Sequence, residues 1–260
     1  MIKLFIMDTE YAVEKMRCEK TYVRSLASQL PASWKKRILT TKSEDLMHDR
    51  ICAYLLLREI VQENGDLIFP EAEETVDDDI NSYCDRAGLA FASSGRPSFE
   101  NADVDFSVSH TTGVVAIAFS FNKEDKVGID VEEISEKTEE AAKKFISRYM
   151  RGKEVKNGDL LFTFDFYDER EVSVYKLGDY GCKKVSNLTL TEDTKTNETP
   201  LKQWTSAEAL LKCDGGGFAS IPHIDEIRSR IAVDNGIMVI SGRKYCISVA
   251  RSIGISPLIV

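Results

Sequence analysis

The segment Val127-Gly128-Ile129-Asp130-Val131-Glu132 alternates apolar side chains with glycine and acidic residues, and it decides the fold prediction. Successive side chains of a β-strand point to opposite faces of the sheet. We therefore expect a strand that buries its apolar side chains and places Asp130 and Glu132 together on the other face. Two carboxylates in this arrangement can share Mg²⁺, a hard cation that prefers oxygen ligands. The competing interpretation is an ordinary strand whose acidic residues face solvent.

Upstream of this segment, the pattern predicts helices and then strands. Residues 1–7 are typical of a first strand, and residues 11–29 of a polar helix. A second helix is expected from Thr41 and Glu44, which have capping-box spacing, to a terminator at Asn64-Gly65. A helical turn near 77–84 and strands at 89–93, 105–109 and 114–119 follow.

Downstream, residues 136–149 predict an amphipathic helix, and residues 160–177 predict a hairpin with three phenylalanines on one face. The polar stretch 191–200 is expected to be a loop. A helix at 206–213 and strands at 236–241 and 244–249 complete the chain. The fold class is therefore α+β. A helix followed by an apolar strand pair on each side of residues 122–125 indicates two similar halves.

Composition argues against several classes of protein. The 260 residues are 43% hydrophobic and 30% charged, which is typical of a globular protein, and the net charge of −9 argues against a general nucleic-acid binder. Six widely spaced cysteines without a CxxC pair favour free thiols in a reducing compartment. No apolar run approaches the roughly 20 residues that cross a bilayer, and the first residues lack the features of a signal peptide. We expect a cytoplasmic protein with no nucleic-acid or membrane partner.

Two further motifs carry polar groups suited to chemistry. In the segment 204–212 (WTSAEALLK), Glu208 and Lys212 share one helix face, where they can bind a metal and its phosphate ligand together. The competing interpretation is a capping box between Thr205 and Glu208, with an ordinary ion pair from Glu208 to Lys212. In the segment 106–113 (FSVSHTTG), a histidine at a strand end suits an anion, although a lone histidine is more often structural. The sequence contains no supporting Ser/His/Asp set and no GxxxxGK[ST] loop.

The order of the motifs resembles the 4′-phosphopantetheinyl transferase superfamily. Gly-Arg-Pro at 95–97, Phe-Ser-Val-Ser-His at 106–110, Gly-Ile-Asp-Val-Glu at 128–132 and Trp-Thr-x-x-Glu-Ala-x-x-Lys at 204–212 follow one another as in its surfactin-type group. Such chains have double length and form a monomeric pseudodimer of two similar α+β halves, each with a small antiparallel sheet packed on helices. The resemblance implies halves at 1–125 and 126–260, with a hairpin and loop insertion at 155–200.

The resemblance also implies an activity and the residues that carry it. A Mg²⁺-dependent enzyme of this type moves the phosphopantetheine arm of coenzyme A to a serine of an acyl or peptidyl carrier protein and releases 3′,5′-ADP. Asp130, Glu132 and Glu208 correspond to the metal ligands. Glu208 also corresponds to the residue that takes the serine proton, and Lys212 to the one that stabilises the departing nucleotide.

Further positions correspond to coenzyme A contacts. His110, with Ser109 beside it, matches the family histidine that contacts the 3′-phosphate. The loop that lines the adenine pocket corresponds to Gly95, Arg96 and Pro97. Additional phosphate contacts are expected from the basic run 35–37 and the helix that follows it, at Lys36, Arg37 and Arg50.

The chain departs from the family pattern at several positions. Ala207 replaces a lysine beside the helix glutamate and so removes a cation expected close to the metal, Arg96 replaces a lysine of the loop, and Ser107 replaces an asparagine. The longer stretch between Asp130 and Glu208 leaves the identity of the carrier open. Two other functions stay open: a phosphoesterase that uses the same carboxylates on a small phosphorylated substrate, and a non-catalytic binding protein that keeps the fold.

Overall fold

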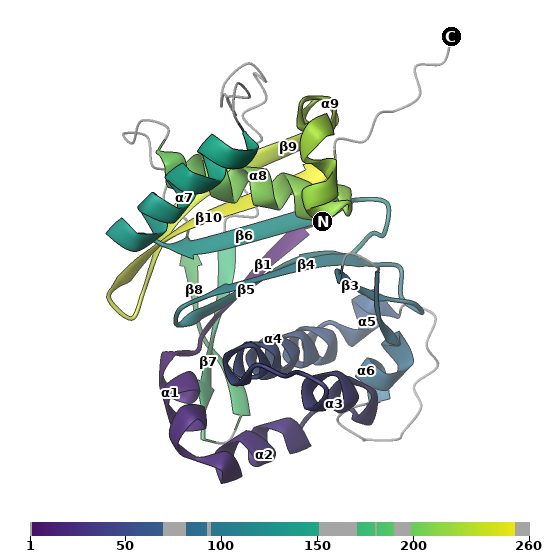
Figure 1. Cartoon of the computed structure of the whole chain (residues 1–260). Helices are drawn as coiled ribbons and strands as arrows, with labels where there is room; N and C mark the ends of the chain where they lie inside the picture. The colour runs from purple at the N-terminus through teal and green to yellow at the C-terminus, as the bar shows by residue number, and fades with distance from the viewer. Residues whose placement is uncertain are drawn as a thin grey trace.

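The computed structural model describes residues 2–69, 82–92, 95–150, 171–179, 181–189 and 199–252 (Figure 1). They form a mixed α+β fold, which confirms the expected fold class. The first half contains β1 (Ile2–Asp8), α1 (Glu10–Cys18), α2 (Lys20–Ser28), α3 (Ala32–Leu39), α4 (Glu44–Glu63), α5 (Gly65–Ile68), α6 (Ser82–Ala87), β2 (Leu89–Phe91), β3 (Pro97–Phe99), β4 (Asp105–Thr111) and β5 (Val114–Ser120). The second half contains β6 (Val127–Glu133), α7 (Glu136–Tyr149), β7 (Glu171–Gly178), β8 (Gly181–Thr189), α8 (Pro200–Asp214), the 3-10 helix η2 (Gly217–His223), α9 (Ile224–Arg228), β9 (Ile231–Ile240) and β10 (Arg243–Ser252).

Two sheets form the centre of the molecule. One has the strand order β4-β5-β1-β7-β8 and the other the order β6-β10-β9, while β2 and β3 pair separately. The pair β1–β7 is parallel, and the remaining pairs of both large sheets are antiparallel. The expectation of a small antiparallel sheet in each half is therefore wrong for the larger sheet, because β7 joins it beside β1 after a long excursion of the chain.

The predicted hairpin at 160–177 falls partly on residues 160–170, which lie outside the described residues. Its predicted returning strand lies in β7, and β7 forms a hairpin with β8, a strand that the sequence analysis did not predict. Because β7 also pairs with β1, this part of the supposed insertion completes the main sheet (Figure 1). The strand order places β8 at the edge opposite β4.

The molecule has four layers, which follow from the alternation of side chains along the strands. One face of the larger sheet packs on the helices that precede β2, with Phe5, Met7 and Phe119 in the shared core. Its other face, which includes Leu4 and Ile6, packs on the smaller sheet. The helices α7, α8 and α9 cover the outer face of that smaller sheet (Figure 1). Val127, Ile129 and Val131 all lie in the core between the sheets, which confirms the predicted orientation of β6.

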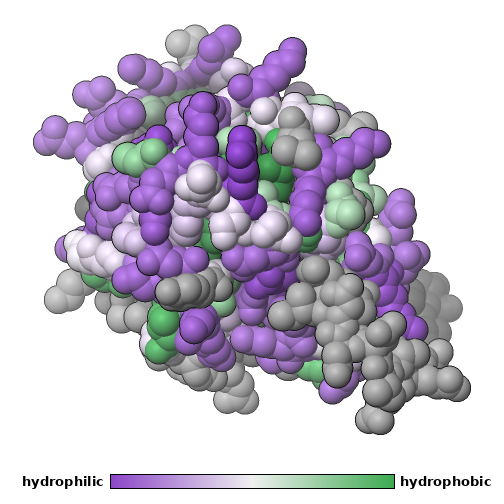
Figure 2. Space-filling view, turned by 90° about the horizontal axis from the view of Figure 1, so that it is seen from below, coloured by the Kyte–Doolittle hydropathy of each residue, from purple (hydrophilic) through white to green (hydrophobic). Residues whose placement is uncertain are grey.

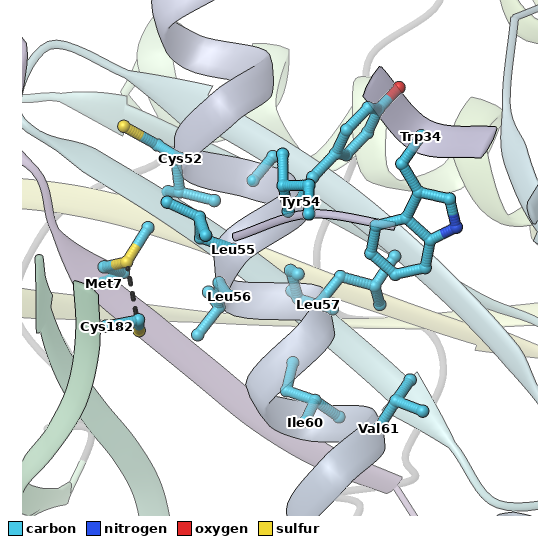
Figure 3. Packing of buried hydrophobic residues seen from close by; sticks show 14 of the residues in the cluster. Met7, Trp34, Cys52, Tyr54, Leu55, Leu56, Leu57, Ile60, Val61 and Cys182 are labelled. Carbon is cyan, nitrogen blue, oxygen red and sulfur yellow. Dashed lines mark hydrogen bonds between the residues drawn. The ribbon is translucent and has the colours of Figure 1, made fainter. Parts of the chain in front are cut away.

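The helix α4 fills the core on the helical side. Figure 3 shows its buried side chains beside Trp34 of α3, with Met7 of β1 and Cys182 of β8 in sulfur contact at 3.4 Å. Its N-cap is Ser43, which accepts from the backbone N–H of Leu46, so the predicted cap at Thr41 is wrong. The predicted end at Asn64 is confirmed. The outer surface seen in Figure 2 is mostly hydrophilic, and within the described ranges the structure contains no helix with the length and apolar character of a membrane span.

The two sheets are joined by side chains, because their adjacent edge strands β4 and β6 do not pair through backbone hydrogen bonds. Every second residue of β4 accepts a hydrogen bond from every second backbone N–H of β6. All three accepting side chains are buried. The bonds run to Asp105 Oδ2 from Val127 N (2.9 Å), to Ser107 Oγ from Ile129 N (3.2 Å) and to Ser109 Oγ from Val131 N (3.3 Å).

The helix α8 lies directly on β6 at Gly128. A Cβ at this position would lie 2.0 Å from the carbonyl oxygen of Ala209 and 2.6 Å from the backbone nitrogen of Cys213. Real Cβ atoms do not approach backbone atoms so closely, and the backbone of a helix cannot yield locally. Glycine therefore permits the helix to reach the strand that carries Asp130.

We predict that Gly128→Ala destabilises the protein by about 1–3 kcal/mol or more, the usual cost of overpacking a core. The reason is that α8 has to move away from β6 to admit the methyl group. Thermal unfolding of the purified variant is the measurement. Gly178→Ala is the matched control, because a Cβ there meets nothing within 4 Å. Equal unfolding temperatures for the two variants would contradict the close contact.

Candidate functional site

Three of the predicted site residues form a hydrogen-bonded triangle where β4, β6 and α8 meet. Lys212 Nζ lies 2.7 Å from Asp130 Oδ1 and 3.1 Å from Ser109 Oγ. Ser109 Oγ in turn donates to Asp130 Oδ1 over 2.8 Å. Asp130 is only 2% exposed, so the ammonium supplies a counter-charge that a buried carboxylate requires. The structure thus brings together residues from three separate motifs.

The remaining two carboxylates, Glu132 and Glu208, flank this triangle. Glu132 follows Asp130 on the same face of β6 and accepts a hydrogen bond from Thr111 Oγ1 at 3.1 Å. Glu208 projects from α8 and accepts a hydrogen bond from Trp204 Nε1 at 2.7 Å. Neither Thr111 nor Trp204 was predicted as a site residue, although each has a spacing that indicates it: Thr111 lies two residues after Ser109 on β4, and Trp204 lies one helical turn before Glu208.

The competing interpretation of the α8 motif was a capping box between Thr205 and Glu208 with an ion pair from Glu208 to Lys212, and both parts are wrong. The helix begins at Pro200, eight residues before Glu208, with Thr199 as its N-cap, so Thr205 and Glu208 form no capping box. Thr205 instead is fully buried and accepts a hydrogen bond from Ser248 Oγ at 2.7 Å. The ion pair of Lys212 is with Asp130, on β6, in place of Glu208 on its own helix.

Mutual repulsion and burial disturb the protonation of these carboxylates. Burial raises the pKa of Glu132 to about 7, with a further contribution from the charge of Asp130. The pKa of Glu208 is also raised, first by burial and then by Asp130, although Lys212 and the Trp204 hydrogen bond oppose the shift. Asp130 Oδ2 is buried without a hydrogen-bond partner among the described residues. The ammonium of Lys212 therefore offsets only part of the negative charge of Asp130, Glu132 and Glu208.

These side chains fit a hard divalent cation by their chemistry. All three carboxylates offer oxygen, which Mg²⁺ prefers, and the unpartnered Oδ2 of Asp130 is a ligand atom that a cation would satisfy. In the described part of the chain, no group of three or more His, Cys, Asp or Glu side chains is already gathered as a metal-ligand set. Asp130, Glu132 and Glu208 are the residues that would hold the ion.

Ala207 points elsewhere. Its side chain is fully buried in an apolar cluster with Met150, Leu211 and Ile224. The resemblance leads one to expect a lysine here, but the side chain at this position packs in an apolar core. The expectation that the alanine removes a cation close to the carboxylates is therefore not supported by the packing.

The loop at 95–97 lies between the two sheets and α8. Gly95 has φ = 85°, a left-handed conformation that favours glycine, and Pro97 begins β3. Arg96 reaches acceptors on three elements: Asp105 Oδ2 at 2.5 Å, the Phe106 carbonyl at 3.3 Å, the Val127 carbonyl at 2.8 Å and the Cys213 carbonyl at 3.4 Å. Its guanidinium thus ties β4, β6 and the end of α8 together, whereas the resemblance assigned it to the adenine pocket.

His110 lies apart from the carboxylates, since it follows Ser109 on β4 and points to the other face. Its ring is 41% exposed, and Nδ1 lies 3.4 Å from Asp49 Oδ2 of α4. Burial raises the pKa of Asp49, while His110 opposes the shift. Arg50, the next residue of α4, donates to Thr41 Oγ1 at 2.5 Å. The predicted phosphate contacts His110 and Arg50 therefore come from neighbouring parts of β4 and α4.

The remaining predicted contacts lie on α3, where Lys36 is exposed. Arg37 belongs to the same helix, and its side chain is outside the described set. Lys36 takes no part in the triangle of Ser109, Asp130 and Lys212.

Comparison of the sequence with protein-family models finds no matching family, and comparison with curated proteins finds no match either. The function is therefore inferred from the residues of this chain and their geometry.

We predict that Arg96→Lys lowers stability by about 2 kcal/mol, because one ammonium cannot replace the fork that binds acceptors on three elements. Thermal unfolding of the purified variant measures the loss. Arg230→Lys, at a half-exposed ion pair with Asp214, is the control with little expected effect. The structural role of Arg96 would be contradicted if both variants unfolded at the same temperature.

A second prediction concerns pH in the absence of divalent cations. The folded-state pKa of Glu132, about 7, lies above the ordinary value of 4.5, so the folded state holds this proton more tightly than the unfolded state. Stability should therefore fall as the pH rises from 4.5 to 7, and Glu132→Gln should remove that part of the fall. At pH 8 the variant should unfold at a higher temperature than the wild type, with no difference at pH 4.

Addition of Mg²⁺ at pH 8 should raise the unfolding temperature of the wild type more than that of Glu132→Gln, because a bound cation stabilises the folded state. Glu133→Gln is the control, since Glu133 lies on the opposite face of β6 and pairs with Arg243. An equal response of both variants would exclude Glu132 from the cation site.

Proposed function

We propose that the chain is a 4′-phosphopantetheinyl transferase, which moves the phosphopantetheine arm of coenzyme A to a serine of an acyl or peptidyl carrier protein. The observation that carries the proposal is the triangle of Ser109, Asp130 and Lys212, flanked by Glu132 and Glu208. These residues come from three motifs spread over the chain, and their meeting at one place supports the proposal. The proposal includes a monomeric, cytoplasmic protein.

The proposed reaction breaks the bond between the β-phosphorus of coenzyme A and its bridging oxygen. Mg²⁺ held by Asp130, Glu132 and Glu208 would neutralise charge on the pyrophosphate. Glu208 accepts the proton of the carrier serine, whose oxygen then bonds to the β-phosphorus. The electron pair of the broken bond leaves with 3′,5′-ADP. Lys212, the one ammonium of the triangle, stabilises the negative charge of this leaving group.

The proposal extends to the architecture. The carboxylates of β6 and Glu208 of α8 belong to the second half of the chain, whereas Ser109 and His110 belong to the first. The site thus lies where β4 meets β6 through their side-chain hydrogen bonds, which we call the β4–β6 seam. This is the position expected for an active site between two halves of a pseudodimer. Coenzyme A would place its 3′-phosphate toward His110 and its pyrophosphate toward the carboxylates.

We predict that the protein, incubated with Mg²⁺ and coenzyme A, adds one phosphopantetheine to a serine of a carrier protein. Intact-mass measurement over a panel of fatty-acid, polyketide and peptide-synthetase carriers detects the product. Glu208→Gln should bind coenzyme A but transfer the arm about 10²–10⁴-fold more slowly, the usual contribution of a general base. Release of phosphate without an acceptor would favour a phosphoesterase, and binding of coenzyme A without turnover would favour a binding protein.

A further inference from the structure

The indole of Trp204 holds one oxygen of the carboxylate of Glu208. The two residues are one turn apart on α8, and Nε1 donates to Oε1 over 2.7 Å. Within the described part of the chain, this is the hydrogen bond that orients Glu208. An indole N–H can only donate. The bond therefore engages one lone pair of Oε1 and leaves the other acceptor positions of the carboxylate available for a proton or a cation.

Trp204 is held in turn by other aromatic side chains. Phe145 of α7 stacks on it, with ring centroids 6.0 Å apart and an interplanar angle of 29°. Tyr149 and Phe218 pack around Phe145 with centroid distances of 5.3 and 6.1 Å. Aromatic pairs at these separations prefer particular relative orientations. The indole therefore has few alternatives to the orientation that meets Glu208.

We infer that Trp204 is a positioning residue for Glu208, with Phe145 as the support of its ring. The inference rests on the proposed function, in which Glu208 receives the serine proton. A glutamate side chain on a helix surface samples several rotamers, and the indole bond removes this freedom before the acceptor arrives. The competing interpretation is packing alone, because Trp204 also packs against the apolar cluster of Ala142, Leu201 and Cys246.

The variant Trp204→Phe separates the two interpretations, since it keeps a ring on Phe145 and removes the N–H. We expect kcat to fall about 10- to 150-fold, the factor that corresponds to a hydrogen bond to a charged group, with KM for coenzyme A unchanged. Trp204→His, which restores a ring N–H donor, should recover part of the loss. An unchanged kcat, or a loss explained by a smaller folded fraction, would show that Trp204 contributes packing alone and does not position Glu208.

Trp34→Phe is the matched control. Trp34 is the other tryptophan of the chain, is 1% exposed, and its Nε1 is buried without a hydrogen-bond partner among the described residues. This substitution also shrinks an indole to a phenyl ring, yet it removes no hydrogen bond. It should lower thermal stability, because a buried ring loses volume, and leave kcat per folded molecule unchanged. A kcat loss equal to that of Trp204→Phe would overturn the inference.

A second measurement needs no carrier protein. The Trp34→Phe variant keeps Trp204 as its single tryptophan, so its fluorescence reports on the indole beside Glu208. Titration with Mg²⁺ alone should change this emission, and Glu208→Gln in the same background should abolish the change. Constant emission, under conditions where calorimetry shows Mg²⁺ binding, would contradict the inference that Trp204 positions Glu208. Failure of the wild type to modify any carrier would instead contradict the proposed function, and the fluorescence result would then decide the role of Trp204.

Discussion

The side-chain ladder between β4 and β6 is the constraint on which the rest of the structure depends. β6 is an edge strand, and its buried N–H groups would cost free energy if left without acceptors. Asp105, Ser107 and Ser109 supply those acceptors in register with the strand. This arrangement joins the two sheets without merging them. It also determines the site, because Ser109 contacts both the backbone of β6 and the carboxylate of Asp130.

The opposite side of the same seam is closed by α8, which packs closely on β6 because of two specific residues. Gly128 lets the helix touch the strand, and Arg96 ties the end of the helix to Asp105 and β6. Because Asp105 also accepts from the backbone of β6, one buried carboxylate serves both the ladder and the Arg96 fork. Fold and site therefore share residues here, so a change that loosens the seam also separates Lys212 from Asp130.

Local patterns along the chain predicted β6 and the second part of α8, which carry the carboxylates, but not the start of α8 at Pro200. The alternation in β6 predicted its buried face and its carboxylates, and the helical pattern of α7 predicted its bounds, Glu136–Tyr149. Non-local pairing was out of reach: nothing in β7 indicates that it runs parallel to β1, and β8 has exposed lysines in place of an apolar face. Residue type alone also left Arg96 undecided, since a guanidinium suits a ligand phosphate as well as protein carbonyls. Only the position of Asp105 and the neighbouring carbonyls distinguishes these uses.

The charge balance at the seam links stability to cation binding. Asp130 is buried and requires a positive partner, which Lys212 provides from the adjacent helix. Glu132 and Glu208 add negative charge that this single ammonium does not neutralise. Burial raises the pKa of both carboxyl groups, and the charge of Asp130 raises it further, so ionising them in the folded state has a cost. The fold carries that cost whenever both are ionised, so a divalent cation bound by these carboxylates would relieve it. Part of the affinity for the cation would then come from relief of repulsion already present in the folded chain. Neutralising Glu132 or Glu208 would stabilise the metal-free protein while weakening its response to the ion.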